Sequence, residues 1–130
     1  MIYKVVRQGD VVVIPVELLR ETTDDNFVTY VNTVLDELEK GSTKSTTVVI
    51  RGENHVHELI GSYKAKLIGE DMYAVVVMEE AELKHAEHGN VKIGKGRYLV
   101  MRIVDAVRRG DSFVATSSLS GNMFLTRAFD

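Results

Sequence analysis

The apolar residues between positions 25 and 40 recur at intervals of three and four, the spacing that places residues on one face of an α-helix. They are Phe27, Val28, Val31, Val34, Leu35 and Leu38. Asp24 or Asp25 can cap the first turn, because a carboxylate accepts hydrogen bonds from the amides there. Gly41 suits the left-handed residue that often ends a helix. We therefore predict one amphipathic helix near residues 25–40.

Short runs of valine, isoleucine and aromatic residues, bounded by turn sequences, make up most of the remaining chain. Gln8-Gly9-Asp10 and Gly69-Glu70-Asp71 are clear turns, and Gly94-Lys95-Gly96 is predicted as a third. The predicted strands include 2–6, 11–16, 48–50, 63–68, 72–78, 91–93 and 98–107. Many short strands and one helix predict a mainly β fold of the β-rich α+β kind, with an antiparallel sheet curled into a barrel or sandwich.

The domain organisation follows from length and from the absence of any linker-like stretch. A chain of 130 residues is the size of one domain, so we predict a single β-rich domain over residues 1–130. Residues 108–130 contain two further apolar runs, at 113–115 and 123–125. This tail is predicted to form either an extra hairpin or a segment that docks on a partner, including a second copy of the chain.

The composition limits the chemistry and the partners. The chain has no cysteine, which excludes disulfides, thiolate metal sites and cysteine nucleophiles. It has neither a basic-then-apolar leader nor an apolar run of about 18 residues, so we expect a cytoplasmic protein that does not span a membrane. A net charge of -3 gives no general attraction for nucleic acid, and a nucleic-acid partner is not expected.

All four histidines fall in two close pairs, His55 with His57 and His85 with His88. A spacing of two puts both rings on one side of a strand, and a spacing of three can do so on one helical turn. If folding brings the pairs together, four imidazoles can bind a divalent transition metal such as zinc, iron or nickel. We therefore predict a metal site formed by these four histidines.

The role of such a site depends on how many histidines bind. Four ligands close the coordination shell and indicate a structural role, whereas three leave a place for an activated water. Glu53 and Glu87 are then candidates for a general base, an additional ligand or a hydrogen-bond partner of a ligand. Whether the protein is an enzyme stays open. The alternative is a metal-free interaction module, with surface histidines, that acts through self-association or partner binding.

Several short motifs fall in one order that resembles a widespread group of small prokaryotic proteins without an assigned function. The motifs are Gln8-Gly9-Asp10-Val11, Gly52-Glu53 before His55-Val56-His57, Leu83-Lys84-His85-Ala86-Glu87-His88-Gly89, and Gly96-Arg97-Tyr98. The chain departs from the group at Asn54, where the group has a longer step. The resemblance implies that the histidines matter and implies no reaction. The His-x-His pair also gives a loose architectural likeness to cupins.

Overall fold

The computed structural model describes residues 5–21, 25–52, 55–87, 89–103, 105–109, 112–117, 121–126 and 128–129. The helical segments are the 3-10 helix η1 (Val16–Glu21) and the helix α1 (Asp25–Lys40). The strands of the first part of the chain are β1 (Val5–Gln8), β2 (Val11–Pro15), β3 (Val49–Arg51), β4 (Val56–Gly69), β5 (Met72–Lys84) and β6 (Val91–Arg102). Those of the tail are β7 (Asp105–Arg109), β8 (Ser112–Ser117), β9 (Gly121–Thr126) and β10 (Ala128–Phe129).

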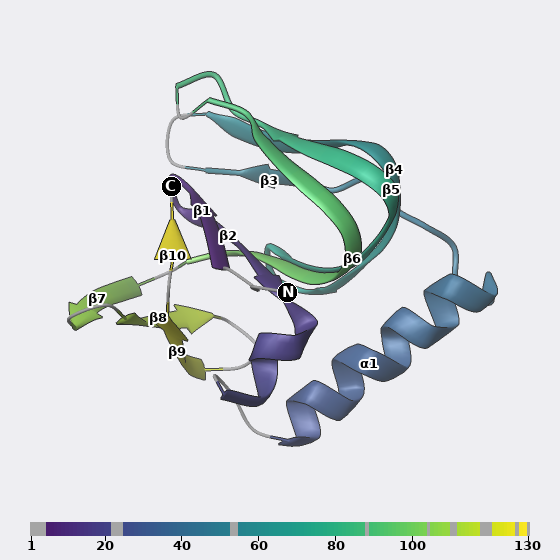
Figure 1. Ribbon diagram of the computed structural model, residues 1–130, viewed down its shortest axis with the longest axis horizontal. Helices are drawn as coiled ribbons and strands as arrows, with labels where there is room; N and C mark the ends of the chain where they lie inside the picture. Colours follow the sequence, from purple (N-terminus) through teal and green to yellow (C-terminus); the bar gives the residue numbers. More distant parts are fainter. Residues whose placement is uncertain are drawn as a thin grey trace.

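One sheet of seven strands dominates the molecule, in the order β10-β1-β2-β6-β5-β4-β3. Its strands pair in antiparallel fashion except for β10, which runs parallel to β1. The sheet curls over on itself into a half-barrel (Figure 1). The mainly β fold, with a curled antiparallel sheet and one α-helix, is therefore confirmed. The curl brings the start of β4 opposite the β1–β2 turn, since side chains from the two segments meet there.

The half-barrel is apolar on both of its faces. Within β2, Val11 and Val13 belong to the apolar cluster inside the barrel, whereas Val12 and Ile14 belong to the cluster on the outer face. Successive strand residues point to opposite sides, so a run of apolar residues buries both sides only if both are covered. The strand ends at Pro15, where the missing backbone N–H prevents further pairing.

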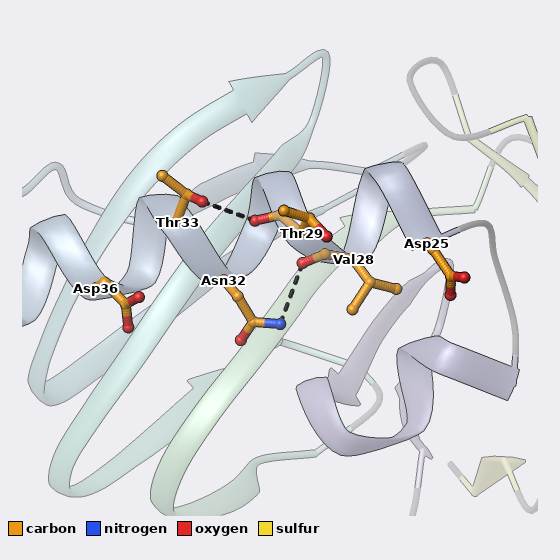
Figure 2. Close-up of a pocket in the computed structure, with 6 residues that line it drawn as sticks. All are labelled: Asp25, Val28, Thr29, Asn32, Thr33 and Asp36. Atoms are coloured by element: carbon orange, nitrogen blue, oxygen red, sulfur yellow. Dashed lines mark hydrogen bonds between the residues drawn. The ribbon is translucent and has the colours of Figure 1, made fainter.

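Helix α1 confirms the helix predicted from the apolar spacing. Gly41 follows it with φ +76°, and the Ser42 amide donates to the Glu37 carbonyl at 3.1 Å, which is the hydrogen bond of a Schellman cap. The outward side of the helix is polar and borders a cavity of about 540 Å³ (Figure 2). In it, Asn32 donates to the Val28 carbonyl at 3.1 Å, so this amide is partly satisfied by the helix itself.

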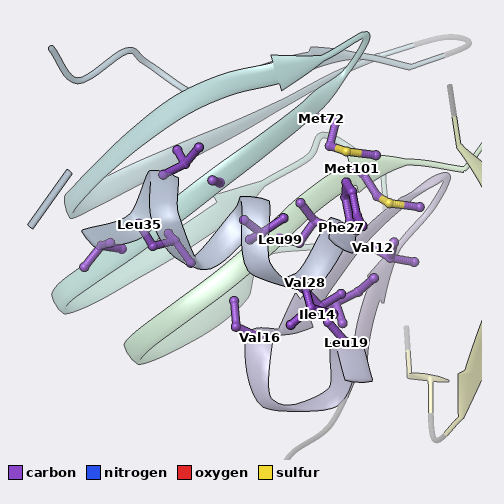
Figure 3. Packing of buried hydrophobic residues seen from close by; sticks show 14 of the residues in the cluster. Val12, Ile14, Val16, Leu19, Phe27, Val28, Leu35, Met72, Leu99 and Met101 are labelled. Carbon is purple, nitrogen blue, oxygen red and sulfur yellow. The ribbon is translucent and has the colours of Figure 1, made fainter. Parts of the chain in front are cut away.

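The inward side of α1 covers the outer face of the sheet. All six apolar residues of the predicted stripe are buried, and they pack against residues of β2, β5 and β6 that include Ile14, Met72 and Leu99 (Figure 3). An exposed ion pair adds to this contact, because Arg97 of β6 donates to Asp36 at 2.7 Å and to Glu39 at 2.9 Å. The hydrogen bond from Arg97 holds the pKa of Glu39 below its ordinary value, and the same bond raises the pKa of Arg97.

The prediction of a turn at Gly94-Lys95-Gly96 is wrong, since β6 runs through these residues without a break. The three residues lie where the long strands bend together, and the β5–β6 register shifts there between Val77 and Glu80. On β4, Gly61 lies at the same bend with φ +135°, and a Cβ on it would lie 2.5 Å from the Glu80 carbonyl oxygen. Bulges and glycines at such a place let a sheet turn a corner, so they shape the barrel.

The tail forms a second sheet of three antiparallel strands in the order β7-β8-β9. Its apolar runs at 113–115 and 123–125 lie on β8 and β9, which pair in antiparallel fashion. Strand β10 then returns to the main sheet, where Ala128 and Phe129 are the partners of Val5 and Val6. Among the helices described, none is long and apolar enough to cross a membrane.

Candidate functional site

His57 is the buried centre of the candidate site, with only 1% of its surface exposed. It lies near the start of β4, opposite Ile50 of β3 in the register. Leu59, two residues further along the same face of the strand, belongs to the apolar cluster inside the barrel. An imidazole in such surroundings needs hydrogen-bond partners, because an unpaired buried polar group is costly.

Both ring nitrogens of His57 have partners from the N-terminal end of the chain. Nδ1 lies 2.9 Å from Oε1 of Gln8, and Nε2 lies 2.9 Å from Oδ1 of Asp10. Gln8 is the last residue of β1 and is itself 1% exposed, and Asp10 lies in the turn that follows. The turn between two valine-rich strands therefore supplies the polar environment of a histidine far along the sequence.

Asp10 links His57 to a cation. Its second oxygen, Oδ2, accepts a hydrogen bond of 2.8 Å from Nε of Arg102, at the end of β6. Burial raises the pKa of Asp10, but the hydrogen bonds from Arg102, from His57 and from the backbone, with the electrostatic attraction of His57, outweigh it and hold the pKa below its ordinary value. The carboxylate is thus ionised near neutral pH and acts only as an acceptor toward Nε2 of His57.

Gly52 lies directly against this histidine–carboxylate contact. A Cβ built on Gly52 would be 2.9 Å from Oδ1 of Asp10 and 3.1 Å from Nε2 of His57. The Gly52 amide donates to the His55 carbonyl at 2.9 Å, which fixes its backbone at this place. Only glycine leaves the space beside the two facing atoms empty, as expected where backbone approaches a site closely.

Two further histidines lie beside His57. The ring centres of His85 and His57 are 4.3 Å apart, and those of His85 and His55 are 5.4 Å apart. Nε2 of His55 lies 2.9 Å from Oε1 of Glu87. The backbone amide of Glu87 donates to Nδ1 of His85 at 3.0 Å, so the short segment after β5 folds back on its own histidine.

His85, one member of the second pair, therefore lies beside both members of the first pair. Three of the four predicted ligands, together with Glu87, gather at one end of the half-barrel. His88 and Glu53, the other two predicted site residues, lie outside the described residues. The residues 85–87 form a turn and not the helical turn considered from the spacing.

The sequence analysis assigned no part in the site to Gln8, Asp10 or Arg102. Gln8 and Asp10 were interpreted as a turn, although both belong to a motif that the resemblance had singled out. Polar residues between two valine-rich strands are the sequence feature that could have marked them. That feature does not show which residue they contact. Arg102 lies at the end of a run of apolar strand residues, which is the corresponding signal on β6.

No set of three or more histidine, aspartate or glutamate side chains among the described residues is arranged to hold a metal ion. The hydrogen bonds give a physical reason. Nε2 of His57 faces Asp10, Nε2 of His55 faces Glu87, and Nδ1 of His85 accepts from the Glu87 amide. Donor atoms bound to protein partners in this way do not point at one common place.

The site has access to the surface beside His85. A cavity of about 310 Å³ lies there. It is lined by Val56, Glu58, Lys84, His85, Ala86 and Asn90. His55 also keeps about a third of its side chain exposed. The cluster is thus buried at His57 and open to solvent at His55 and His85.

Fold and site together define a small β half-barrel protein with a cluster of histidines and carboxylates at one end of the barrel. The chain belongs to the family described as "Domain of unknown function (DUF8820)", which matches residues 7–103. The match runs from β1 to the end of β6 and includes every described residue of the cluster, whereas strands β7 to β10 lie outside it. Neither the curated proteins nor the solved structures contain a match to the chain.

Proposed function

We propose that the cluster binds a divalent transition-metal ion, with His57 and Asp10 at its centre. His55 and His85 are the further ligands within reach, and His88 is the fourth histidine of the predicted set. The observation that carries the proposal is the arrangement of the central pair. Nε2 of His57 and Oδ1 of Asp10 face each other at 2.9 Å, while Gln8 and Arg102 hold the outer atoms of the two side chains. Metal ligands are commonly held in this way by a second layer of hydrogen bonds.

The distances and the free space suit an ion. Two donors that each lie about 2.0–2.1 Å from a tetrahedral ion are about 3.3–3.4 Å apart, so the two facing atoms, now 2.9 Å apart, need to separate by only about 0.4–0.5 Å. The missing side chain of Gly52 leaves room next to both donor atoms. Imidazole and carboxylate together suit zinc, iron or nickel, and the chain offers no thiolate that would favour a softer ion.

Metal binding would replace hydrogen bonds that the metal-free protein makes. An ion would come between His57 and Asp10, and it would replace the contact between His55 and Glu87 and the hydrogen bond of the Glu87 amide to His85. Protons and metal ions therefore compete for the same nitrogens, and the affinity for the ion falls as the pH falls. Glu87, and Glu53 as predicted from the sequence, are then the candidates for an additional ligand or a general base.

The number of ligands decides the role of the ion. Four protein ligands would make it structural, and three would leave a position for water or a small substrate. The cavity beside His85 favours the second arrangement, because it gives solvent a route to the cluster. The metal-free interaction module remains the alternative prediction. The observation on the tail that concerns this alternative is that its last strand, β10, pairs with β1 of the same chain.

The test is metal analysis of the full-length protein, produced without a histidine tag and stripped by chelation. Titration with Zn²⁺, Ni²⁺ and Co²⁺ should show one ion per chain, and bound Co²⁺ should give a visible absorption spectrum. His55→Gln is the informative variant, since His55 is partly exposed and its loss leaves the core intact. It should weaken binding at least about tenfold, and Asp10→Asn should do the same.

Glu79→Gln is the matched control, because Glu79 is an exposed carboxylate of β5 that takes no part in the cluster. It should bind the ion like the natural chain. A full-length protein that takes up no ion at stoichiometric concentration would refute the proposal. So would an affinity that His55→Gln and Asp10→Asn leave unchanged.

A further inference from the structure

One amide side chain touches both halves of the cluster. Nε2 of Gln8 donates to the Leu83 carbonyl at 2.8 Å and to the Gly89 carbonyl at 2.6 Å. Oε1 of the same side chain lies 2.9 Å from Nδ1 of His57. Gln8 is the only glutamine of the chain and is almost completely buried. Its contacts are therefore made without competition from solvent.

The count of donors and acceptors fixes the orientation of this amide. Its NH₂ group has two hydrogens, and two backbone carbonyls, which can only accept, take both of them. The oxygen therefore faces His57 and can only accept, so Nδ1 of His57 must carry a hydrogen. Nε2 is left as the one ring nitrogen that can face an ion.

The two carbonyls also enclose a segment of the site. Leu83 precedes and Gly89 follows the residues that carry His85 and Glu87. Gly89 has φ +72°, a backbone conformation that favours glycine and lets the chain turn back toward Gln8. Because one NH₂ group binds both carbonyls, the ends of the segment are held a few ångströms apart, and the histidine between them is held near His57.

We infer that Gln8 is the positioning residue that assembles the cluster, in two separable ways. Its oxygen selects the nitrogen of His57 that faces Asp10, and its NH₂ group closes the loop that carries His85. The inference rests on the proposed function only in that Nε2 is taken as the atom that meets an ion. The hydrogen on Nδ1 and the closed loop are properties of the metal-free protein.

The first measurement needs no variant. Proton–nitrogen NMR of the metal-free, full-length chain should show a slowly exchanging hydrogen on Nδ1 of His57. The amide of Glu87, which donates to Nδ1 of His85 within this segment, should be protected from exchange with solvent. An Nδ1 without a hydrogen would overturn the inference, whether or not the protein binds a metal.

Two variants separate the two roles. An ionised Glu in Gln8→Glu keeps an oxygen for Nδ1 but has no hydrogens for the carbonyls, so Nδ1 should keep its hydrogen while the Glu87 amide loses protection. Gln8→Leu offers neither, and both signals should be lost, with metal affinity at least about tenfold weaker. Circular dichroism identifies a variant that has not folded, and in that case the measurement on the natural chain decides.

The outcomes also distinguish this inference from the metal proposal. A chain that binds no ion but shows the hydrogen on Nδ1 and the protected loop refutes metal binding and supports the role of Gln8. A folded Gln8→Leu variant with an unchanged loop and unchanged metal affinity refutes the role of Gln8 alone.

Discussion

Replacement of Gly52 by alanine tests the centre of the site with a single added methyl group. The new Cβ would lie 2.9 Å from Oδ1 of Asp10 and 3.1 Å from Nε2 of His57. Arg102 and Gln8 hold the far sides of these two side chains, so neither can retreat without losing a hydrogen bond. Gly52 does not have a positive φ, so the effect is steric and does not come from backbone strain.

The expected size follows from the cost of overpacking. Forcing extra carbon into a packed site costs about 1–3 kcal/mol of unfolding free energy, and breaking the His57–Asp10 contact is part of that. Gly94→Ala is the control, because a Cβ on Gly94 meets nothing within 4 Å. It should be neutral or should stabilise by about 0.4–1 kcal/mol, since alanine restricts the unfolded chain. Gly61→Ala should cost more than Gly52→Ala, because φ is +135° and the Glu80 carbonyl oxygen is only 2.5 Å away.

Urea denaturation followed by circular dichroism gives the three free energies, and metal titration of Gly52→Ala gives the effect on the site. We expect Gly94→Ala to be the most stable of the three variants, Gly52→Ala to be less stable and Gly61→Ala to be the least stable. Gly52→Ala should also bind the metal ion at least about tenfold more weakly than the natural chain. The reasoning is refuted if Gly52→Ala is as stable as Gly94→Ala and binds the ion as tightly as the natural chain. That result would mean that the space beside Asp10 and His57 is not needed.

The other predictions concern pH, packing and surface charge. The pKa of Asp10 is lower in the folded protein than in the unfolded chain. The contribution of this carboxylate to the free energy of unfolding is therefore complete above the unfolded pKa of about 4 and is lost as the pH falls through the folded pKa. The difference in urea midpoint between the natural chain and Asp10→Asn should thus shrink below about pH 4, and a constant difference from neutral to acid pH would contradict this. Leu35→Ala creates a cavity at a fully buried position in the core under α1 and should lower the free energy of unfolding by about 2–5 kcal/mol. Tyr30, on the same helix, is 45% exposed, so Tyr30→Ala should change this free energy by less than about 0.5 kcal/mol. Arg97→Gln removes an exposed ion pair and should lower the free energy of unfolding by no more than about 1 kcal/mol. The difference from the natural chain should disappear in 1 M salt, and a difference that salt does not reduce would show that Arg97 acts through packing.

The sequence alone determined the features that depend on neighbours along the chain. Helix α1 follows from its apolar spacing, and the first two turns follow from Gln8-Gly9-Asp10 and Gly69-Glu70-Asp71. The unbroken apolar run of β2 reflects a strand that is buried on both faces. Three of the four histidines that the sequence singled out, His55, His57 and His85, lie together in the structure. Such features need only the period of a helix or strand and the chemistry of a turn.

Only the tertiary structure decided which atoms face each other. Gln8 and Asp10 lie 49 and 47 residues before His57 in the sequence, and Arg102 lies 92 residues after Asp10, so no local pattern connects them. They meet because the sheet bends at Gly61 and at residues 94–96 and curls until β4 lies opposite the β1–β2 turn. The same bend explains why Gly94-Lys95-Gly96 was wrongly predicted to be a turn: glycines that end one strand and glycines that bend a strand look alike until the partner strands are known.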